Sequence, residues 1–248
     1  MNFTLDPQVE SYLNHNLQLI DEEDFEGLYK NFPNPKRFWT EIANMTAALY
    51  LAGIDPLESS NKVFSCMFHS FPSGILPSSY ILPRQIESIE DWAFKYSMFE
   101  ELIFPQALTK IHDAAFRGME KLKSVVFNPH SKIEYIGVDA FKGTTNIQNF
   151  IMPKSCKKID VEAFAYCGGL DTHLKLSEDL EILGKGAFFK TKIETVEFGP
   201  NLRIISGHPL YGCDNLKEII IPRASFDRVR GNVKEILTDG NNAKVIVV

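Results

Sequence analysis

Residues 111–127 of this chain read Ile111-His-Asp-Ala-Ala-Phe116-Arg-Gly-Met-Glu-Lys-Leu122-Lys-Ser-Val125-Val-Phe127. The apolar residues of this stretch follow a fixed order: an aliphatic residue, an Ala-Phe pair, and then Leu-x-x-Val-x-Phe. The same order returns about six times between residues 80 and 222. Because self-similarity with a period in the twenties is typical of leucine-rich solenoids, the stretch predicts a repetitive architecture.

The Ala-Phe pair sets the register of the copies. Aligned on the second residue of the pair, the copies lie 22, 25, 23, 24 and 22 residues apart. The pairs are Ala93-Phe94, Ala115-Phe116, Ala140-Phe141, Ala163-Phe164, Ala187-Phe188 and a degenerate Pro209-Leu210. We expect Ala where a turn crowds the sheet and Phe between layers. A single unit cannot bury its own apolar face, so stacked copies must share one core.

Two apolar elements flank each pair. An Ile-x-x-Ile-like element precedes it, and a Leu-x-x-Val-x-Phe run follows it, which we predict to be a strand. The core positions of the predicted strands are Phe99/Leu102/Phe104, Leu122/Val125/Phe127, Ile147/Phe150/Met152, Leu170/Leu174/Leu176, Ile193/Val196/Phe198 and Leu216/Ile219/Ile221. The strand that begins at Leu170 carries one extra residue, which predicts a small bulge.

The residues before the repeats show helical periodicity, so we predict an N-terminal helical domain over residues 1–75. A first helix is expected after Asp6-Pro7, and a second with Asp21 as its N-cap. A third is expected to begin at Asn34-Pro35 and to end at Gly53. The polar faces of these helices are acidic as well as basic, which favours packing within the protein over a membrane anchor.

The chain after the repeats departs from the pattern. We predict the solenoid over residues 76–224 and a C-terminal cap over residues 225–248. Residues 225–236 fit a short helix, and residues 244–248 fit a strand that would cover the last open edge. The expected fold class is therefore α+β: a leucine-rich-repeat solenoid of about six repeats, with a helical domain before it and a cap after it.

The repeats resemble the BspA-type leucine-rich repeat over residues 80–222. The closest matches are Ile136-Gly137, Ala140-Phe141, Ala163-Phe164-Ala-Tyr-Cys167 and Tyr211-Gly-Cys213-Asp-Asn-Leu216. This resemblance implies a right-handed solenoid and protein recognition, often on a microbial surface. In addition, the stretch Ala48-Leu-Tyr-Leu-Ala-Gly-Ile-Asp-Pro-Leu57 is similar to a helical lead-in of tailed-bacteriophage proteins, which implies a phage protein that acts on a host protein.

Charge and composition restrict the partners. The net charge is −6 and the pI is near 5.6, which argues against nucleic acid or an anionic membrane as a partner. No apolar run approaches the roughly 18 residues of a membrane span. The first ten residues lack the basic and apolar regions of a signal peptide, so we expect a cytoplasmic protein, located in the host cytoplasm if phage-encoded.

Reactive side chains offer little chemistry. Cys167 and Cys213 occupy the same slot of the repeat, so they are either a redox or metal pair or small polarisable fillers between layers. The repeat position favours the fillers, and Cys156 replaces an aliphatic core residue. The six histidines lack metal-ligand spacing. We therefore predict no catalytic, cofactor-binding or metal-binding residues, and no enzyme.

The candidate site is the surface of the predicted strands. Residues between the core positions point outward, because side chains alternate along a strand. Twelve such residues form the candidate partner-binding set: Glu101, Ile103, Ser124, Val126, Asn149, Ile151, His173, Lys175, Thr195, Glu197, Glu218 and Ile220. The apolar members Ile103, Val126 and Ile151 indicate an interaction site. The alternative is that the N-terminal domain or a second copy covers them.

The sequence thus favours a non-enzymatic protein–protein interaction module that binds a protein partner through its strand face. The alternative is a structural or adhesive component of a virion or cell surface, and an enzyme ranks third. A homo-oligomer is also considered, since a structural subunit should self-associate whereas a soluble binding module should not.

Overall fold

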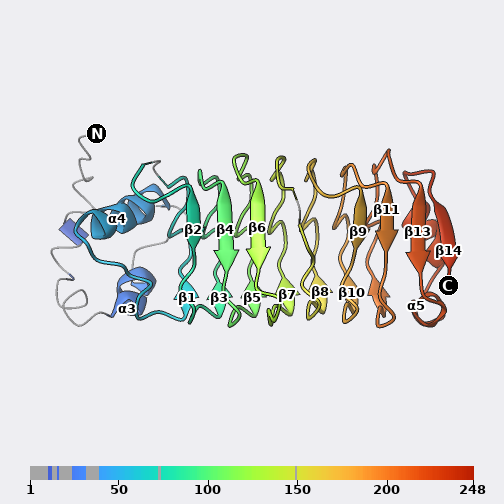
Figure 1. Cartoon of the computed structure of the whole chain (residues 1–248), viewed down its shortest axis with the longest axis horizontal. Helices are drawn as coiled ribbons and strands as arrows, with labels where there is room; N and C mark the ends of the chain where they lie inside the picture. The colour runs from blue at the N-terminus through green and yellow to red at the C-terminus, as the bar shows by residue number, and fades with distance from the viewer. Residues whose placement is uncertain (1–10, 13–15, 17–23, 32–38, 72–73, 149) are drawn as a thin grey trace.

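The computed structural model describes residues 11–12, 16, 24–31, 39–71, 74–148 and 150–248. Over these residues the chain winds into an elongated solenoid with helices at its N-terminal end (Figure 1). Short strands follow one another along one side of the solenoid, and longer strands follow one another along a second side (Figure 1). Every strand pairing within these sheets is parallel, as expected when successive turns stack in register.

The Ile-x-x-Ile elements form the first side. Each of the six contributes a two-residue strand, and β1 before them adds a seventh, to a sheet of order β1-β3-β5-β7-β8-β10-β12. The strands are β1 (Lys62–Val63), β3 (Ser88–Ile89), β5 (Lys110–Ile111), β7 (Tyr135–Ile136), β8 (Lys158–Ile159), β10 (Ile182–Leu183) and β12 (Ile204–Ile205). The sequence predicted a strand only downstream of each Ala-Phe pair, so this sheet adds a second strand to each turn.

The Leu-x-x-Val-x-Phe runs form the second side, which is divided into two sheets. One has the order β2-β4-β6 and the other β14-β13-β11-β9. The strands are β2 (Ser79–Ile81), β4 (Glu101–Phe104), β6 (Ser124–Phe127), β9 (His173–Lys175), β11 (Thr195–Glu197), β13 (Glu218–Ile221) and β14 (Lys244–Val247). The predicted core positions of these strands point inward, as Leu102, Val125 and Ile219 are at most 3% exposed.

The described residues of 147–152, which exclude Asn149, form no strand, so the strand predicted there was wrong. Only an isolated bridge joins Gln148 to Ser124, although Phe150 and Met152 are buried as expected. The bulge predicted after Leu170 does not interrupt the pairing of that strand, because β9 pairs regularly with β11. The second side is therefore interrupted at one layer, while the first side continues past it.

A column of stacked phenylalanines runs through the core. Ring centroids in neighbouring turns are 4.7–5.4 Å apart, and the ring planes lie within 17° of parallel. The six rings are those of Phe68, Phe94, Phe116, Phe141, Phe164 and Phe188, and all are fully buried. This confirms that the Phe of each Ala-Phe pair fills the space between layers.

Each turn also contains backbone in the left-handed region. In the turn after β3, for example, Trp92 has φ of 62° and Tyr96 has φ of 58°. In the turn after β7, Asp139 has φ of 56° and Gly143 has φ of 76°. Two left-handed residues four positions apart recur between the first and second sides because the turns share one conformation; in the last turn Gly207 and Gly212 are five apart.

The N-terminal residues form helices α3 (Phe25–Lys30) and α4 (Trp39–Leu51). The N-cap of α3 is Asp24, whose side chain accepts from the Gly27 N–H, whereas the predicted cap Asp21 lies outside the described residues. The helix start predicted at Asn34-Pro35 and the helix predicted after Asp6-Pro7 also lie largely outside them. Gly53 ends α4 as predicted, with φ of 80° and its N–H donating to the Tyr50 carbonyl.

The solenoid begins earlier than the repeat pattern indicated. Strand β1 pairs with β3, and Phe68 starts the phenylalanine column, although both lie among residues expected to be helical. Tyr50 of α4 contacts this first turn: its hydroxyl donates to Asp55 Oδ1 (2.9 Å) and lies 3.0 Å from the hydroxyl of Tyr80. Helix α4 is therefore attached to β2 through a polar contact.

The C-terminal residues form α5 (Arg223–Arg228), α6 (Val233–Thr238) and β14. The sequence predicted one helix over residues 225–236, but Val229 is extended and separates two six-residue helices. The predicted final strand is present and pairs with β13. It extends the second side of the solenoid by one strand, and no corresponding strand follows β12 in the part of the chain described.

Candidate partner-binding surface

The outward residues of β2, β4 and β6 are aligned across the sheet. The strand register places Ile81 beside Ile103 and Ile103 beside Val126, so three apolar side chains form one row. Ile81 is 66% exposed and Val126 is 42% exposed, whereas Ile103 between them is half-buried. The second row of the same strands is polar and includes Glu101 and Ser124. We call the row Ile81, Ile103 and Val126 the apolar row.

The outward residues of the other sheet have a different chemistry. One row aligns Lys175, Glu197 and Ile220, and Lys175 Nζ lies 3.3 Å from Glu197 Oε1. The other row aligns His173, Thr195 and Glu218. The twelve candidate residues therefore do not form one uniform surface, because the half on β9, β11 and β13 is largely charged.

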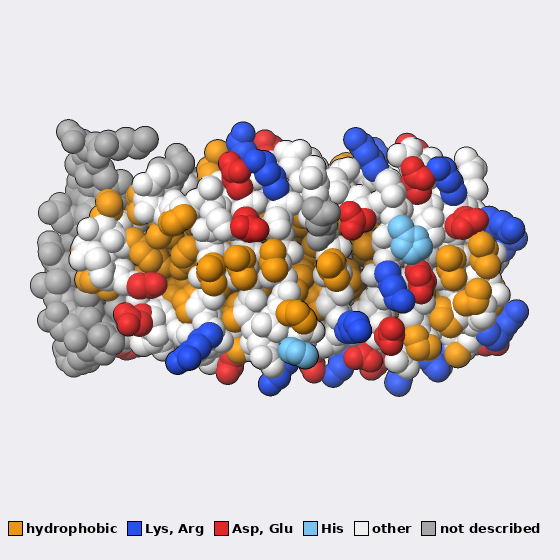
Figure 2. Space-filling model, viewed as in Figure 1, with side chains coloured by type: hydrophobic (Ala, Val, Ile, Leu, Met, Phe, Trp, Pro, Cys, Tyr) orange, Lys and Arg blue, Asp and Glu red, His pale blue; other side chains and the backbone are white. Residues whose placement is uncertain are grey.

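The layer between the two sheets also divides the candidate set. Ile151 is 76% exposed, but it lies in the segment that forms no strand. Asn149 lies outside the described residues. Figure 2 shows the outcome: a row of orange side chains over β2, β4 and β6 gives way to charged side chains over β9 and β11.

Sequence reasoning missed two members of these rows. Ile81 begins the apolar row, and Ile246 of β14 continues the row of Ile220. The signal for Ile81 was present, since Tyr80 and Leu82 flank it as core residues flank Ile103. It was missed because no Ala-Phe pair precedes it; Met67 and Phe68 take that position.

A groove of about 750 Å³ lies beside the apolar row. Its floor includes Ile81, Ile103 and Pro105, and its rim carries Arg84 and Lys132. None of the described residues that line it has a carboxylate. An apolar floor with a basic rim suits a protein segment that presents an apolar side chain next to an acidic one.

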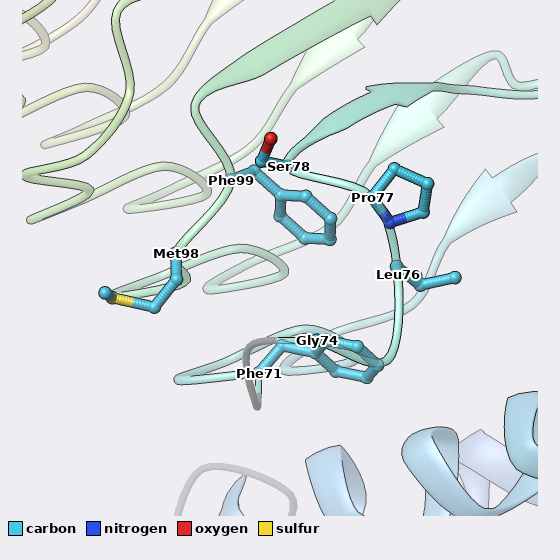
Figure 3. A pocket seen from close by; sticks show the side chains of 7 residues that line it. All are labelled: Phe71, Gly74, Leu76, Pro77, Ser78, Met98 and Phe99. Carbon is cyan, nitrogen blue, oxygen red and sulfur yellow. The ribbon is translucent and has the colours of Figure 1, made fainter.

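A smaller cavity of about 260 Å³ lies near the first turn (Figure 3). Phe71, Leu76, Met98 and Phe99 line most of it, and Ser78 has the one polar side chain among its seven described lining residues. A cavity of this composition can hold an apolar group but offers no charged group for acid–base chemistry.

The cysteines occupy the positions expected of fillers. The thiols of Cys167 and Cys213 donate to the carbonyls of Phe141 (3.0 Å) and Phe188 (3.1 Å), each in the preceding turn. Burial raises the pKa of Cys167 and of Cys156 to about 12, so neither thiol ionises near neutral pH. Among the described residues, no group of three or more His, Cys, Asp or Glu side chains could hold a metal ion.

These features define a class: a parallel solenoid of leucine-rich repeats whose strand face offers a surface rather than a reactive centre. The chain belongs to the family described as "BspA type Leucine rich repeat region". Residues 53–171 and 163–233 match it, in six copies. Proteins with such repeats generally serve as surface or interaction modules, and the fold is typically a non-enzymatic scaffold.

Several solved structures of bacterial leucine-rich repeat proteins are similar. A leucine-rich repeat protein of T. pallidum is 21% identical over 57% of this chain and 68% of its own, with a TM-score of 0.51. A leucine rich cell surface protein of Faecalibacterium prausnitzii is 20% identical over 56% of this chain and 46% of its own (TM-score 0.47). A leucine-rich repeat protein of Bacteroides ovatus is 24% identical over 76% of this chain and 53% of its own, with a TM-score of 0.46.

This chain spans about half the length of the last two proteins. At these identities the similarity concerns the fold alone. None of the curated proteins compared with the sequence matches it. No helix among the described residues has both the length and the apolar composition needed to cross a bilayer.

Proposed function

We propose that this chain is a non-enzymatic module that binds a protein partner through the apolar row and the groove beside it. The observation that carries this proposal is the register of Ile81, Ile103 and Val126, which aligns three apolar side chains on a solvent-facing strand surface. Solvation alone would favour polar residues there, as on the equivalent rows of β9 and β11.

The stacked core supports this use of the surface. Strands held between buried layers give the apolar row a fixed shape, so binding orders few additional groups. The basic rim at Arg84 and Lys132 adds electrostatic preference for an acidic partner segment. Apolar contact supplies affinity in this scheme, and the rim supplies selectivity and orientation.

A charge-substituted variant tests the proposal. Val126→Glu with Ile151→Lys places one charge on the apolar row and one on the exposed residue of the neighbouring layer, without touching the core, so the fold should be retained. We expect the variant to lose a partner that the unmodified chain enriches from a lysate, as measured by quantitative mass spectrometry and then by titration of the purified partner.

The matched control is Leu51→Glu with Tyr166→Lys, which makes the same charge changes at exposed side chains away from the apolar row. It should keep the partner. Circular dichroism and the melting temperature must show that both variants fold. Equal binding of the partner by the Val126/Ile151 variant and the unmodified chain would contradict the proposal.

A second candidate function, a subunit of a larger assembly, is favoured by apolar exposure at the C-terminal end. Ile246 continues the row of Ile220, and Val248 is 67% exposed beside it. An assembly subunit should self-associate as its concentration rises, which light scattering would detect. A soluble binding module should remain at one mass over the same range.

We further propose that the protein is of bacteriophage origin, has a host protein as its partner and acts in the cytoplasm. We also propose a division into a helical domain (1–75), a solenoid (76–224) and a C-terminal cap (225–248). The phage origin is supported by the resemblance of residues 48–57 alone. The helical domain is supported by α4 and the cap by the added strand β14, whereas the first strand of the solenoid at Lys62 argues for a boundary before residue 75.

A further inference from the structure

The seven-stranded sheet ends at β12, and that strand has an open edge. In the turn before it, the Glu181 carbonyl accepts from the Arg203 N–H and the Leu183 carbonyl accepts from the Ser206 N–H, both at 2.9 Å. The corresponding carbonyls one turn later are those of Arg203 and Ile205. Neither accepts a hydrogen bond from any residue that the structure describes.

The C-terminal segment adds a strand only to the other side of the solenoid. Strand β14 supplies the next layer beyond β13, with the Lys244 N–H donating to the Lys217 carbonyl (2.8 Å) and the Val248 N–H to the Ile221 carbonyl (3.0 Å). No equivalent strand lies on β12 within the described residues. The two sides therefore end differently, although every earlier turn is extended on the first side by the turn that follows.

A groove of about 650 Å³ lies at the edge of β12. Its floor is apolar, with Ile204 49% exposed and Val229 buried, and its walls carry Arg203, Arg228 and Arg230. No carboxylate is among the described residues that line it. Three guanidinium groups beside apolar lining residues, in a chain of net charge −6, favour an acidic occupant.

The charges along the sheet indicate where the occupant's carboxylate would lie. Lys157 lies between Glu134 of the preceding turn (2.8 Å) and Glu181 of the following turn, and both carboxylates raise its pKa, the hydrogen-bonded Glu134 most. Arg203 has Glu181 on one side, 3.7 Å away, and the groove on the other. A carboxylate in the next layer would complete the alternation of charges.

We propose that the open edge of β12 binds an extended, acidic segment of a partner protein, which takes the place that a further turn of the solenoid would occupy. The segment's N–H groups donate to the Arg203 and Ile205 carbonyls, as those of each following turn do elsewhere in the sheet. Its carboxylate lies against Arg203, and an adjacent apolar side chain covers Ile204. This site is separate from the apolar row.

The chain itself provides the probe. Residues 178–184, Glu-Asp-Leu-Glu-Ile-Leu-Gly, lie on β8 in this way and place Glu181 beside Lys157. A capped peptide of this sequence, titrated into the isotope-labelled full chain, should shift the backbone amide resonances of Ile205, Ser206 and Arg230 in a saturable manner. Arg203→Glu with Arg230→Glu should weaken binding at least tenfold.

Two controls separate strand addition from simple charge attraction. Arg223→Glu with Lys234→Glu makes the same change of charge on α5 and α6 outside the groove, and it should leave peptide binding unchanged. A peptide N-methylated at its second glutamate and at its glycine loses the N–H groups that Glu181 and Gly184 donate to β8. It should also bind at least tenfold more weakly.

The proposal is overturned if the amides do not shift at millimolar peptide, or if the N-methylated peptide binds as well as the original. Tighter binding of a single-stranded oligonucleotide of equal charge would assign the groove to nucleic acid instead. Self-association of the chain that the Arg203/Arg230 variant abolishes would assign the edge to a second copy. The Val126/Ile151 variant should bind the peptide normally, so the two proposals can fail independently.

Discussion

One phenylalanine per turn fills the space between successive layers of the core. Phe116 and Phe141 lie in the middle of the column, with ring centroids 4.9 Å apart, and each also contacts a second stacked neighbour. Offset stacking at this distance adds to the gain from burying the ring. Each ring therefore stabilises the contact of its own turn with both neighbouring turns.

Removal of a central ring should be costly. Phe116→Ala or Phe141→Ala leaves a cavity between two layers, and each should lower the free energy of unfolding by about 3–5 kcal/mol in urea titrations. Phe116→Leu, which keeps most of the volume, should cost clearly less. Unchanged stability of both alanine variants would contradict the stacked-core description.

Alanine substitutions at two glycines distinguish the cost of backbone strain from the cost of a close contact between turns. Gly143 has φ of 76°, and a Cβ there would have no neighbour nearer than 3.9 Å, so Gly143→Ala should cost only about 1–2 kcal/mol from strain. A Cβ at Gly184 would lie 2.4 Å from the Asp160 carbonyl carbon in the preceding turn. Gly184→Ala should therefore cost more, because the two turns must move apart. Equal losses in urea unfolding would refute this distinction.

At the scale of elements, the interruption at residues 147–152 makes one layer of the second side different from the others. Gly169 of the next copy lies so close to it that a Cβ there would be 2.4 Å from the Ile147 carbonyl oxygen. Strand pairing is lost on the side toward Ile147, and β9 keeps its regular pairing with β11.

Hydrogen exchange should detect this layer. The N–H groups of Ile151 and Met152 donate to no backbone carbonyl among the described residues, whereas those of β4 and β6 belong to a paired ladder. We expect the amides of Ile151 and Met152 to exchange much faster than those of Ile103 and Val126. Equal protection would show that the second side is continuous in solution.

The stacked core could be predicted from the sequence because an Ala-Phe pair recurs in the copies and aligns them with one another. The interruption could not be predicted, since pairing depends on how two turns fit together and both turns contain the expected apolar residues. The first turn was missed because Ser60 and Met67 replace residues that the pattern requires. The seven-stranded sheet was missed because two-residue strands leave no alternation to detect.

The candidate surface was predictable in part for the same reason. Alternation along the strand identified Ile103 and Val126 as outward residues, and the structure aligns them. It could not show that Ile81 joins their row, nor that charges separate this row from Ile220. The groove at β12 could not be predicted from the repeat pattern. Arg203 and Arg230 are far apart in the sequence, and only the fold brings them to the same groove.

At the scale of the whole molecule, buried thiols make stability depend on alkaline pH. The pKa of Cys156 and Cys167 is about 12 in the folded chain, against about 8.5 for a free thiol, and burial also raises the pKa of Cys213. Above pH 8.5 the unfolded chain releases these protons and the folded chain keeps them. Their contribution to stability is therefore full below that pH and falls as pH rises toward 12.

Urea unfolding at pH 7.5, 8.5 and 9.5 would measure this effect. Each thiol should contribute a slope of up to about 1.4 kcal/mol per pH unit above its unfolded pKa. Cys167→Ala should lower stability at neutral pH and also make the alkaline slope shallower. The range stops at pH 9.5 because burial also raises the pKa of Tyr80, which would add a fall of the same sign at higher pH. An unaltered slope would contradict the assignment.

The interrupted second side gives the solenoid an uneven bending stiffness. The seven-stranded sheet acts as a continuous spine, because hydrogen bonds cross every layer from β1 to β12. On the other side, the hydrogen-bonded sheets stop at β6 and resume at β9. A force that bends the molecule would therefore change the spacing of the second side first at that layer, because no sheet hydrogen bonds resist the change there. The apolar row and the charged rows would then change their angle while each kept its own spacing.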